Sequence, residues 1–280
     1  MHTWHLTWSS VGRRPLAPDE GVRRRLIRAL ARVAGGEVVL YSVVDDHIHV
    51  VLYCDDVRRG VLSGALTFAF RALVAAPLDP PFVRPVRDRS HMDWLADGYI
   101  LRQSWKHGIA GHPAVWTGSC FPDLVGARIL PGLNLRIATA LPRWRLRRAY
   151  AAVFLPERPL QPADDARLRA VGAARLASAA ASAVGAEPTL TGKGAAEVLA
   201  RRAAATLGTA AGIPGPEIAH ALGMHPVACA RLRHRAVEER VLAAVRLWIA
   251  LEDEAAASPA PAQPPPVVRE PDGPDYEPGR

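Results

Sequence analysis

Apolar and polar positions along the first part of the chain repeat with two periods, one of two residues and one of about 3.6 residues. Segments with the two-residue period or a short apolar run predict strands, at residues 5–9, 38–44, 48–53 and 82–86. Segments with an apolar stripe at helical spacing predict helices, at residues 20–33, 57–75 and 92–106, with Asp55-Asp56 and Ser90 as expected N-caps. This order of elements predicts an α+β fold, with helices packed on a largely antiparallel sheet.

After residue 131 the chain changes to Ala- and Arg-rich helical segments that several prolines interrupt. A linker is expected at residues 186–194, before a compact helical unit, and the last stretch is rich in Pro, Ala and acidic residues. The sequence therefore predicts four regions: a sheet-containing domain at 1–130, a helical connector at 131–190, an all-α helix-turn-helix domain at 191–254 and a disordered tail at 255–280.

The composition of the 280 residues, 49% apolar and 22% charged, is typical of a globular protein and excludes a wholly disordered chain. Charges interrupt every apolar run before it is long enough to span a membrane. The start, MHTWHLTWSS, lacks the basic end and apolar centre of a signal peptide. The three cysteines lie far apart without a CxxC pair, so neither a zinc knuckle nor a disulfide framework is indicated. We expect a soluble, cytoplasmic protein.

The positive charge is concentrated in the first half of the chain. Residues 1–150 contain 21 Lys and Arg against 12 Asp and Glu, whereas residues 151–280 contain 14 against 15. A GC-rich genome would explain the preference for Arg over Lys, but it would not explain why the excess lies in one half. Because guanidinium groups suit phosphate, nucleic acid is the expected class of partner.

Two histidines, His47 and His49, lie two residues apart at the start of an expected strand. Side chains alternate faces along a strand, so the two imidazoles project together while Ile48 faces the core. Such a pair can bind a divalent metal ion; the alternative is a polar strand face in contact with solvent. Asp46 either forms the hairpin turn with Asp45, which we favour, or hydrogen-bonds an imidazole.

A tyrosine and a glutamine, Tyr99 and Gln103, lie four residues apart in an expected helix and therefore share one face. A phenolic oxygen can attack phosphorus once it is activated, and a carboxamide oxygen can bind a metal ion. The alternative is a helical tyrosine that only packs, with its hydroxyl at the surface.

Residues 216–235 have the spacing of a helix-turn-helix, with Gly223 at the turn. The apolar positions expected to face the core are Ile218, Ala219, Leu222, Val227, Ala230 and Leu232. The side chains of the second helix that could contact DNA are Arg231, Arg233, His234 and Arg235. The alternative is an ordinary helical bundle whose arginines form a solvated face.

Taken together, these features resemble a known family, the single-tyrosine HUH transposases, which includes insertion-sequence enzymes and the REP-associated tyrosine transposases. The resemblance covers residues 2–128 and is carried by the segments HLTWS, VVDDHIHVVL and YILRQSWKHGIAGHP. The stretch Trp116–Ser119 also resembles a Trp-Ser-Ser region of REP-associated members. The helix-turn-helix loosely resembles the DNA-binding domain of the bacterial replication initiator.

The resemblance implies that His47, His49 and Gln103 are ligands of Mg²⁺ or Mn²⁺, and that Tyr99 is the catalytic nucleophile. The implied substrate is single-stranded or hairpin DNA. Tyr99 would attack the scissile phosphate, release a 3′-hydroxyl and form a 5′-phosphotyrosine link, which a second 3′-hydroxyl could reverse to join DNA. The family includes dimers and monomers, so a homodimer stays open.

The chain departs from the pattern of REP-associated members at two places. Asp45-Asp46 precedes the first histidine, where those members have Pro-Asn. Gln103-Ser104-Trp105 stands where they have Asn-Pro-Val. Gln103 resembles the insertion-sequence branch instead, so the implied ligand is kept while the subgroup is not defined.

Other tyrosines and other functions stay open as alternatives. Tyr41 and Tyr53 are expected on strands and Tyr150 lies outside the resemblance, which favours Tyr99. The second hypothesis for function is a sequence-specific DNA-binding regulator that keeps the fold without the chemistry. The third is a metal-dependent hydrolase without a covalent intermediate, which the lack of a visible carboxylate cluster disfavours.

Overall fold

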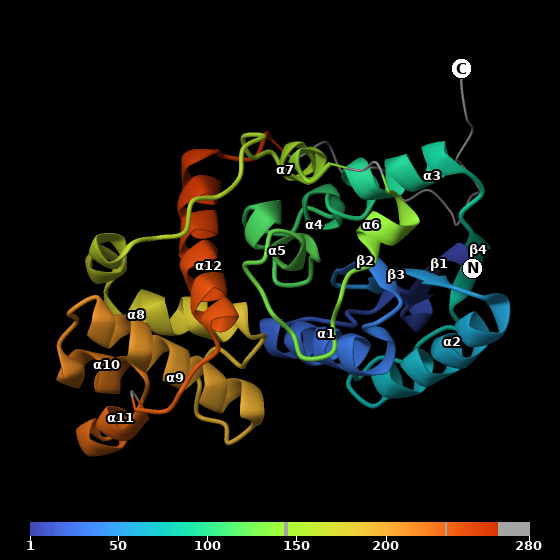
Figure 1. Cartoon of the computed structure of the whole chain (residues 1–280). Helices are drawn as coiled ribbons and strands as arrows, with labels where there is room; N and C mark the ends of the chain where they lie inside the picture. The colour runs from blue at the N-terminus through green and yellow to red at the C-terminus, as the bar shows by residue number, and fades with distance from the viewer. Residues whose placement is uncertain (143–144, 233, 263–280) are drawn as a thin grey trace. The chain divides into compact units, whose positions relative to one another are not determined.

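The computed structural model describes residues 1–142, 145–232 and 234–262, which form two compact units (Figure 1). The first, here the sheet unit, comprises Met1–Phe121, Pro131–Arg158 and the chain from Ala255. The second, here the helical unit, comprises Pro122–Leu130 and Pro159–Glu254. The connector expected at residues 131–190 is divided between the two units, and the functional domain boundaries stay a prediction of the sequence.

The sheet unit has the predicted α+β fold. Its strands are β1 (His2–Ser9), β2 (Val38–Val43), β3 (His47–Cys54) and β4 (Phe82–Pro85). They form one antiparallel sheet in the order β2-β3-β1-β4. All four expected strands are confirmed, although β1 begins at His2 rather than at residue 5, and β3 includes both histidines.

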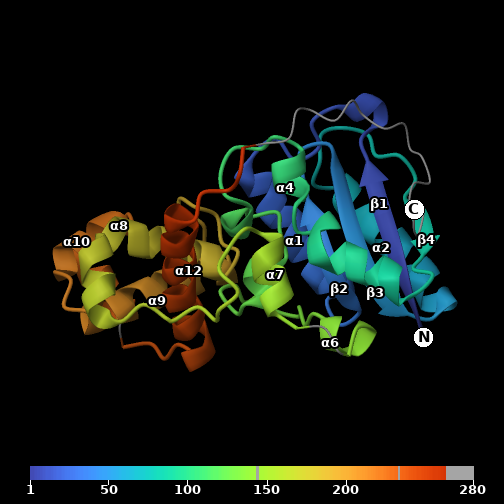
Figure 2. The same ribbon diagram turned by 90° about the horizontal axis from the view of Figure 1, so that it is seen from above.

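Helices cover both faces of this sheet. The helices of the sheet unit are α1 (Glu20–Ala34), α2 (Asp56–Arg71), α3 (Arg89–Trp94), α4 (Gln103–Lys106), α6 (Ile137–Ala140) and α7 (Arg147–Ala152). The helices α1 and α2 lie on one side of the sheet, and α3, α4 and α6 lie on the other (Figures 1 and 2). On the α2 side, the buried indole of Trp8 donates a hydrogen bond to Thr67 Oγ1 at 2.8 Å and meets the ring of Phe70 edge-on at 5.2 Å. Because Trp8 points toward α2 and side chains alternate along a strand, the residues next to Trp8 point to the opposite face of the sheet.

One of the two expected N-caps is confirmed and the other is wrong. The carboxylate of Asp55 accepts a hydrogen bond from the backbone N–H of Arg58 at 2.7 Å, as predicted for the start of α2. Ser90, however, lies inside α3, because Asp88 accepts the backbone N–H of His91 at 2.8 Å and begins the helix earlier. A carboxylate at this position also interacts favourably with the helix dipole.

The helical unit has the expected all-α fold. Its helices are α8 (Asp165–Ala183), α9 (Ala195–Ala210), α10 (Gly215–Ala221), α11 (Pro226–Leu232) and α12 (Glu239–Ala257), with the short α5 (Phe121–Leu124) at its edge. The expected linker lies between α8 and α9. Because α12 continues to Ala257, the first residues of the expected tail are helical, and residues 263–280 lie outside the described residues. Among the described helices, none combines the length and the apolar composition of a membrane span.

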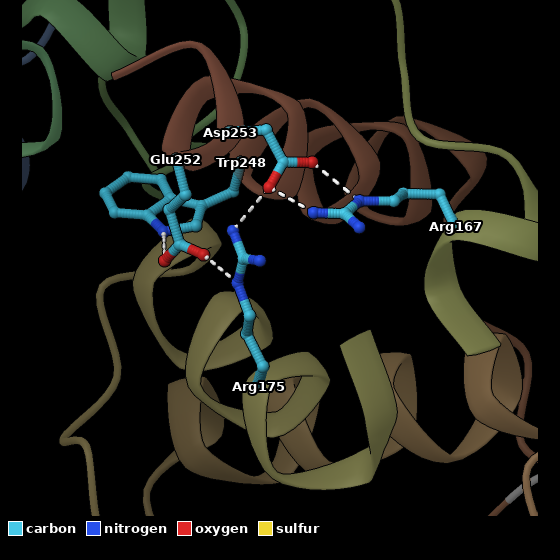
Figure 3. A network of polar contacts seen from close by, with 5 residues as sticks. All are labelled: Arg167, Arg175, Trp248, Glu252 and Asp253. Carbon is cyan, nitrogen blue, oxygen red and sulfur yellow. Dashed lines mark hydrogen bonds and ion pairs between the residues drawn. The ribbon is translucent and has the colours of Figure 1, made fainter. Parts of the chain in front are cut away.

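A network of charged side chains joins α8 to α12 (Figure 3). Arg167 Nε donates to Asp253 at 2.8 Å, and Arg175 Nε donates to Glu252 at 2.9 Å. The indole of Trp248 donates to the same Glu252 carboxylate at 2.9 Å. The hydrogen bond from Arg167, together with one from Arg175, lowers the pKa of Asp253. The network therefore favours the ionised form of Asp253 and holds the two helices together.

The turn between α10 and α11 has the expected geometry. Gly223 adopts φ +61°, a left-handed conformation that glycine accepts without steric cost. The buried apolar side chains of α10 and the turn are Ile218, Ala219 and Leu222, as predicted. The prediction for Val227 is wrong, because this side chain is 55% exposed and Cys229 is buried instead.

Candidate functional site

The face of the sheet opposite Trp8 carries a group of histidines. In the register of β1 and β3, Thr7 pairs with His49 and Ser9 pairs with His47, so these side chains and that of His5 share one face. The alternation predicted for the two histidines is therefore confirmed. Their alternative, a strand face in contact with solvent, is wrong, because His47 and His49 are only 5% and 3% exposed.

The ring nitrogens of this histidine pair have defined partners on one side. His47 Nδ1 lies 2.7 Å from an Asp46 carboxylate oxygen, and His49 Nδ1 lies 3.0 Å from His5 Nε2 and 3.2 Å from Thr7 Oγ1. Asp46, for which the turn was favoured, thus also hydrogen-bonds an imidazole. The opposite nitrogen of His49, Nε2, is buried without a hydrogen-bond partner. A buried polar atom of this kind is costly unless a ligand satisfies it, so the pair is suited to a metal ion.

Burial keeps two of these imidazoles neutral. Loss of solvation, followed by the charges of His91, Arg84 and His47, lowers the pKa of His5 to about 3. Loss of solvation, followed by the neighbouring histidines and Lys106, lowers the pKa of His49 well below its ordinary value. A neutral imidazole has a lone pair for a metal ion, whereas a protonated one has none.

Tyr99 lies beside the histidines because the helix expected at 92–106 is interrupted. After α3 the backbone forms a π-helical turn, η2 (Leu95–Tyr99), and α4 begins only at Gln103. The Tyr99 ring lies 5.4 Å from the ring of His49 and 6.0 Å from that of His5. It also stacks on Trp94, at 4.1 Å between centroids. Single π-helical turns are frequent at functional sites, and this one carries the candidate nucleophile.

Gln103 is buried beside the backbone of Tyr99. Its side chain is 2% exposed, and its amide nitrogen donates to the carbonyl oxygen of Tyr99 at 2.8 Å. The spacing of four residues therefore produces a side-chain bond to the backbone of the tyrosine. This bond uses the amide nitrogen, and the role of Gln103 as a metal ligand stays a prediction.

His107, which the sequence reasoning missed, does approach the pair. Its ring lies 4.7 Å from the ring of His47, and His47 lies 4.5 Å from His49. One potential ligand atom from each of Asp46, His47 and His107 lies within 4.8 Å of the others. The signal was available, because His107 follows Gln103 by the same four residues that separate Gln103 from Tyr99.

The alternative tyrosines do not lie at this site. Tyr41 is fully buried, and Tyr150 is 4% exposed and packs edge-on against Phe121 at 5.5 Å. Tyr53 pairs with Thr3, at the end of β1 and β3 that is remote from His47. Among the tyrosines that the structure describes, Tyr99 is thus the one next to the histidines.

The stretch Trp116–Ser119 is built against the edge of β2. The Trp116 indole donates to the carbonyl oxygen of Val43 at 3.0 Å, and Val43 N–H donates to Gly118 at 2.8 Å. A side chain at Gly118 would collide with the Val43 carbonyl oxygen. This stretch therefore extends the sheet edge, which is a structural role.

The candidate DNA-binding residues of the helical unit lie at and beyond the end of α11. The expected second helix is shorter than predicted, because α11 ends at Leu232. Arg231 is exposed in its last turn, and His234 and Arg235 are exposed after it. Arg233 lies outside the described residues. The DNA contacts of these side chains stay a prediction.

Comparisons with known proteins give a similarity to a solved structure. No family model matches the chain, and no curated protein matches it. Among solved structures, the chain is similar to one described as a REP-associated tyrosine transposase bound to a REP hairpin, with 20% sequence identity and a TM-score of 0.38. The similarity covers 48% of this chain and 82% of that one. At this level, an assignment of function depends on the residues of the site itself.

Proposed function

We propose that the sheet unit cleaves and joins single-stranded or hairpin DNA by the single-tyrosine HUH mechanism, as a transposase or a nuclease derived from one. The observation that carries the proposal is the Tyr99 ring at 5.4 Å from His49, whose buried Nε2 has no hydrogen-bond partner. A nucleophile beside nitrogens that can hold a metal ion suits transfer of a phosphoryl group. The basic first half of the chain supports DNA as the substrate.

The metal-binding part of the proposal assigns His47 and His49 as ligands of Mg²⁺ or Mn²⁺, with Gln103 as the third ligand that the family resemblance implies. When bound, such an ion would act as a Lewis acid that partly neutralises the negative charge of the scissile phosphate. Asp46 and His5 hold the Nδ1 sides of the two imidazoles, at 2.7 and 3.0 Å. Such partners orient the rings and would leave the Nε2 atoms to hold a metal ion.

In the proposed reaction the phenolic oxygen of Tyr99 attacks the phosphorus of the DNA backbone. As the new bond forms, the phenol loses its proton. The bond from phosphorus to the 3′ oxygen breaks, that oxygen takes up a proton in exchange, and the 5′ phosphate stays on Tyr99. Attack by another 3′-hydroxyl reverses these steps and joins two strands without ATP. The Lys106 ammonium, 4.8 Å from the Tyr99 ring centre, supplies positive charge where negative charge develops.

The second part of the proposal is that the helix-turn-helix, within the predicted domain at 191–254, adds affinity for DNA. The exposed side chains of Arg231, His234 and Arg235 support it, and Arg233 belongs to the same proposal. The same exposed side chains favour the second candidate function, a DNA-binding regulator without chemistry. Whether the protein acts as a homodimer stays open.

The experiment is incubation of the purified protein with labelled single-stranded hairpin DNA and Mn²⁺, followed by a denaturing gel. We expect a slow, protease-sensitive band of protein joined to DNA, absent in Tyr99→Phe and present in the matched control Tyr53→Phe. Tyr99→Phe should still bind DNA. DNA binding by the wild type without such a band, over varied hairpins, would favour the regulator.

A further inference from the structure

The helix α2 is apolar on two opposite sides. Its inner side packs in the sheet unit through the buried side chains of Leu62 and Leu66. Its outer side carries Val57, Val61 and Phe68, which are 80%, 57% and 79% exposed. A surface helix ordinarily has polar residues on the side away from the core, so this apolar outer side indicates a contact with another protein surface.

The neighbouring helix α1 has the ordinary pattern. At the positions where α1 is not buried, it carries mainly arginines: Arg23, Arg25, Arg28 and Arg32. Both helices lie on the same side of the same sheet (Figures 1 and 2). The place in the sheet unit therefore does not explain why α2, unlike α1, is apolar on its outer side.

Two glycines lie at the centre of this outer side. Gly60 and Gly64 have helical backbone conformations inside α2, where glycine is less favourable than alanine. A Cβ atom added at either position would meet nothing within 4 Å, so packing within the described residues does not require a glycine there. Small residues at a helix surface do, however, allow a second helix to approach closely.

Four residues of the outer side have the spacing of a contact between two helices. Val57, Val61, Gly64 and Phe68, here the α2 stripe, follow one another at intervals of four, three and four residues, which is the heptad spacing. In an antiparallel pair of two such helices, Val57 of one copy lies opposite Phe68 of the other. Val61 lies opposite Gly64, which leaves room for it. The stripe is therefore complementary to itself about a two-fold axis.

The ends of α2 carry opposite charges, which favours the antiparallel order. Asp56 lies at the start of α2 and Arg71 at its end, and both are exposed. Asp56 forms an ion pair with Arg59 of the same helix at 2.7 Å, and its side chain is still 69% exposed. Antiparallel packing brings Arg71 of each copy within about one helical turn of Asp56 of the other, whereas parallel packing brings like charges together.

We propose that the α2 stripe docks a second copy of this chain, as a two-fold symmetric, antiparallel pair of α2 helices. The stripe lies on the side of the sheet opposite to the histidine face, so this contact does not cover the histidines or Tyr99 (Figures 1 and 2). One helix pair is a small interface, so we expect a reversible dimer. This inference goes beyond the proposed function and does not depend on it.

The test is the mass of the full chain in solution without DNA, from sedimentation velocity over a range of concentrations. We expect the wild type to change from monomer to dimer as the concentration rises. Phe68→Glu should weaken dimerisation by at least about a hundredfold, because it puts a charge into an apolar contact. The matched control is Phe82→Glu, at an exposed phenylalanine on β4, which should dimerise as the wild type does. Both positions are exposed, so both variants should fold, which circular dichroism checks.

Two further changes test the geometry. Gly64→Leu adds apolar surface and should strengthen a non-specific association, whereas close packing at Gly64 predicts a loss of at least about tenfold. Arg71→Glu should weaken the dimer, and adding Asp56→Arg to the same chain should restore it, because both charges are then reversed. A wild type that is monomeric at every concentration would overturn the inference. So would a dimer that Phe68→Glu leaves intact, that Phe82→Glu disrupts or that Gly64→Leu strengthens.

Discussion

The histidine face of the sheet unit and the exposed end of α11 in the helical unit present their polar side chains in opposite ways. His47 and His49 are almost fully buried, and their Nδ1 atoms are held by neighbouring side chains. Arg231 and Arg235, by contrast, are exposed at and after a short helix. The first arrangement fixes geometry by packing and suits chemistry at one phosphate, whereas the second suits binding in which each charge adds a small, salt-dependent increment.

Removal of the histidine pair should have the largest effect. Replacing both His47 and His49 with Ala should lower metal-dependent DNA cleavage by about a thousandfold or more, because the ion loses its ligands. Cleavage of labelled hairpin DNA in Mn²⁺ measures the loss. His2→Ala is the matched control and should cleave as the wild type does. Undiminished cleavage in the double variant would exclude the pair as ligands.

Substitutions of apolar side chains in the helix-turn-helix should distinguish buried positions from exposed ones by their effect on stability. Ile218→Ala removes a buried side chain that contacts α9 near Gly208, and should cost about 2–4 kcal/mol of unfolding free energy. Val227→Ala, at a position 55% exposed, should change it by less than about 0.5 kcal/mol. Urea denaturation followed by circular dichroism measures both. A cost at Val227 equal to that at Ile218 would show that Val227 is packed after all.

The positive charge of Arg231 in α11 should contribute to DNA affinity in a way that depends on salt concentration. Arg231→Ala should weaken DNA binding by about tenfold or less and reduce the slope of affinity against salt by about one counterion. A fluorescence anisotropy series from low to high salt measures this. Mn²⁺ affinity should not change, since the metal site belongs to the sheet unit. An unchanged slope would place the DNA contacts elsewhere.

The network in Figure 3 gives the smallest expected effect, and it depends on pH. Hydrogen bonds from Arg167 and Arg175 lower the pKa of Asp253 in the folded state, so its contribution is present at neutral pH and is lost as the pH falls through that pKa. Because these groups are partly exposed, Asp253→Asn should cost only about 0.5–1 kcal/mol at neutral pH. Thermal melts of the two proteins should converge in acid; a constant difference would contradict the linkage.

Local pattern was enough to predict the strands and the pairing of the histidines. The alternation around Ile48 depends only on strand geometry, and the structure confirms it. The helix that carries Tyr99 was harder to predict. The apolar periodicity indicates one continuous helix at 92–106 and gives no sign of the π-helical turn within it. Val227 was misplaced for a related reason: a seven-residue helix has too few apolar positions to define its buried face.

The sequence by itself determined the α+β order and the shared face of His47 and His49, since both follow from the period of the apolar positions. The choice of Tyr99 came from the resemblance to a known family. Only the tertiary structure decided what surrounds them. It brought His5 from β1 and His107 from beyond α4 to the pair, and it turned Gln103 onto the backbone of Tyr99. The physical reason is that spacing fixes direction within a strand or helix, whereas contacts between elements depend on how the chain packs and on where a helix is interrupted.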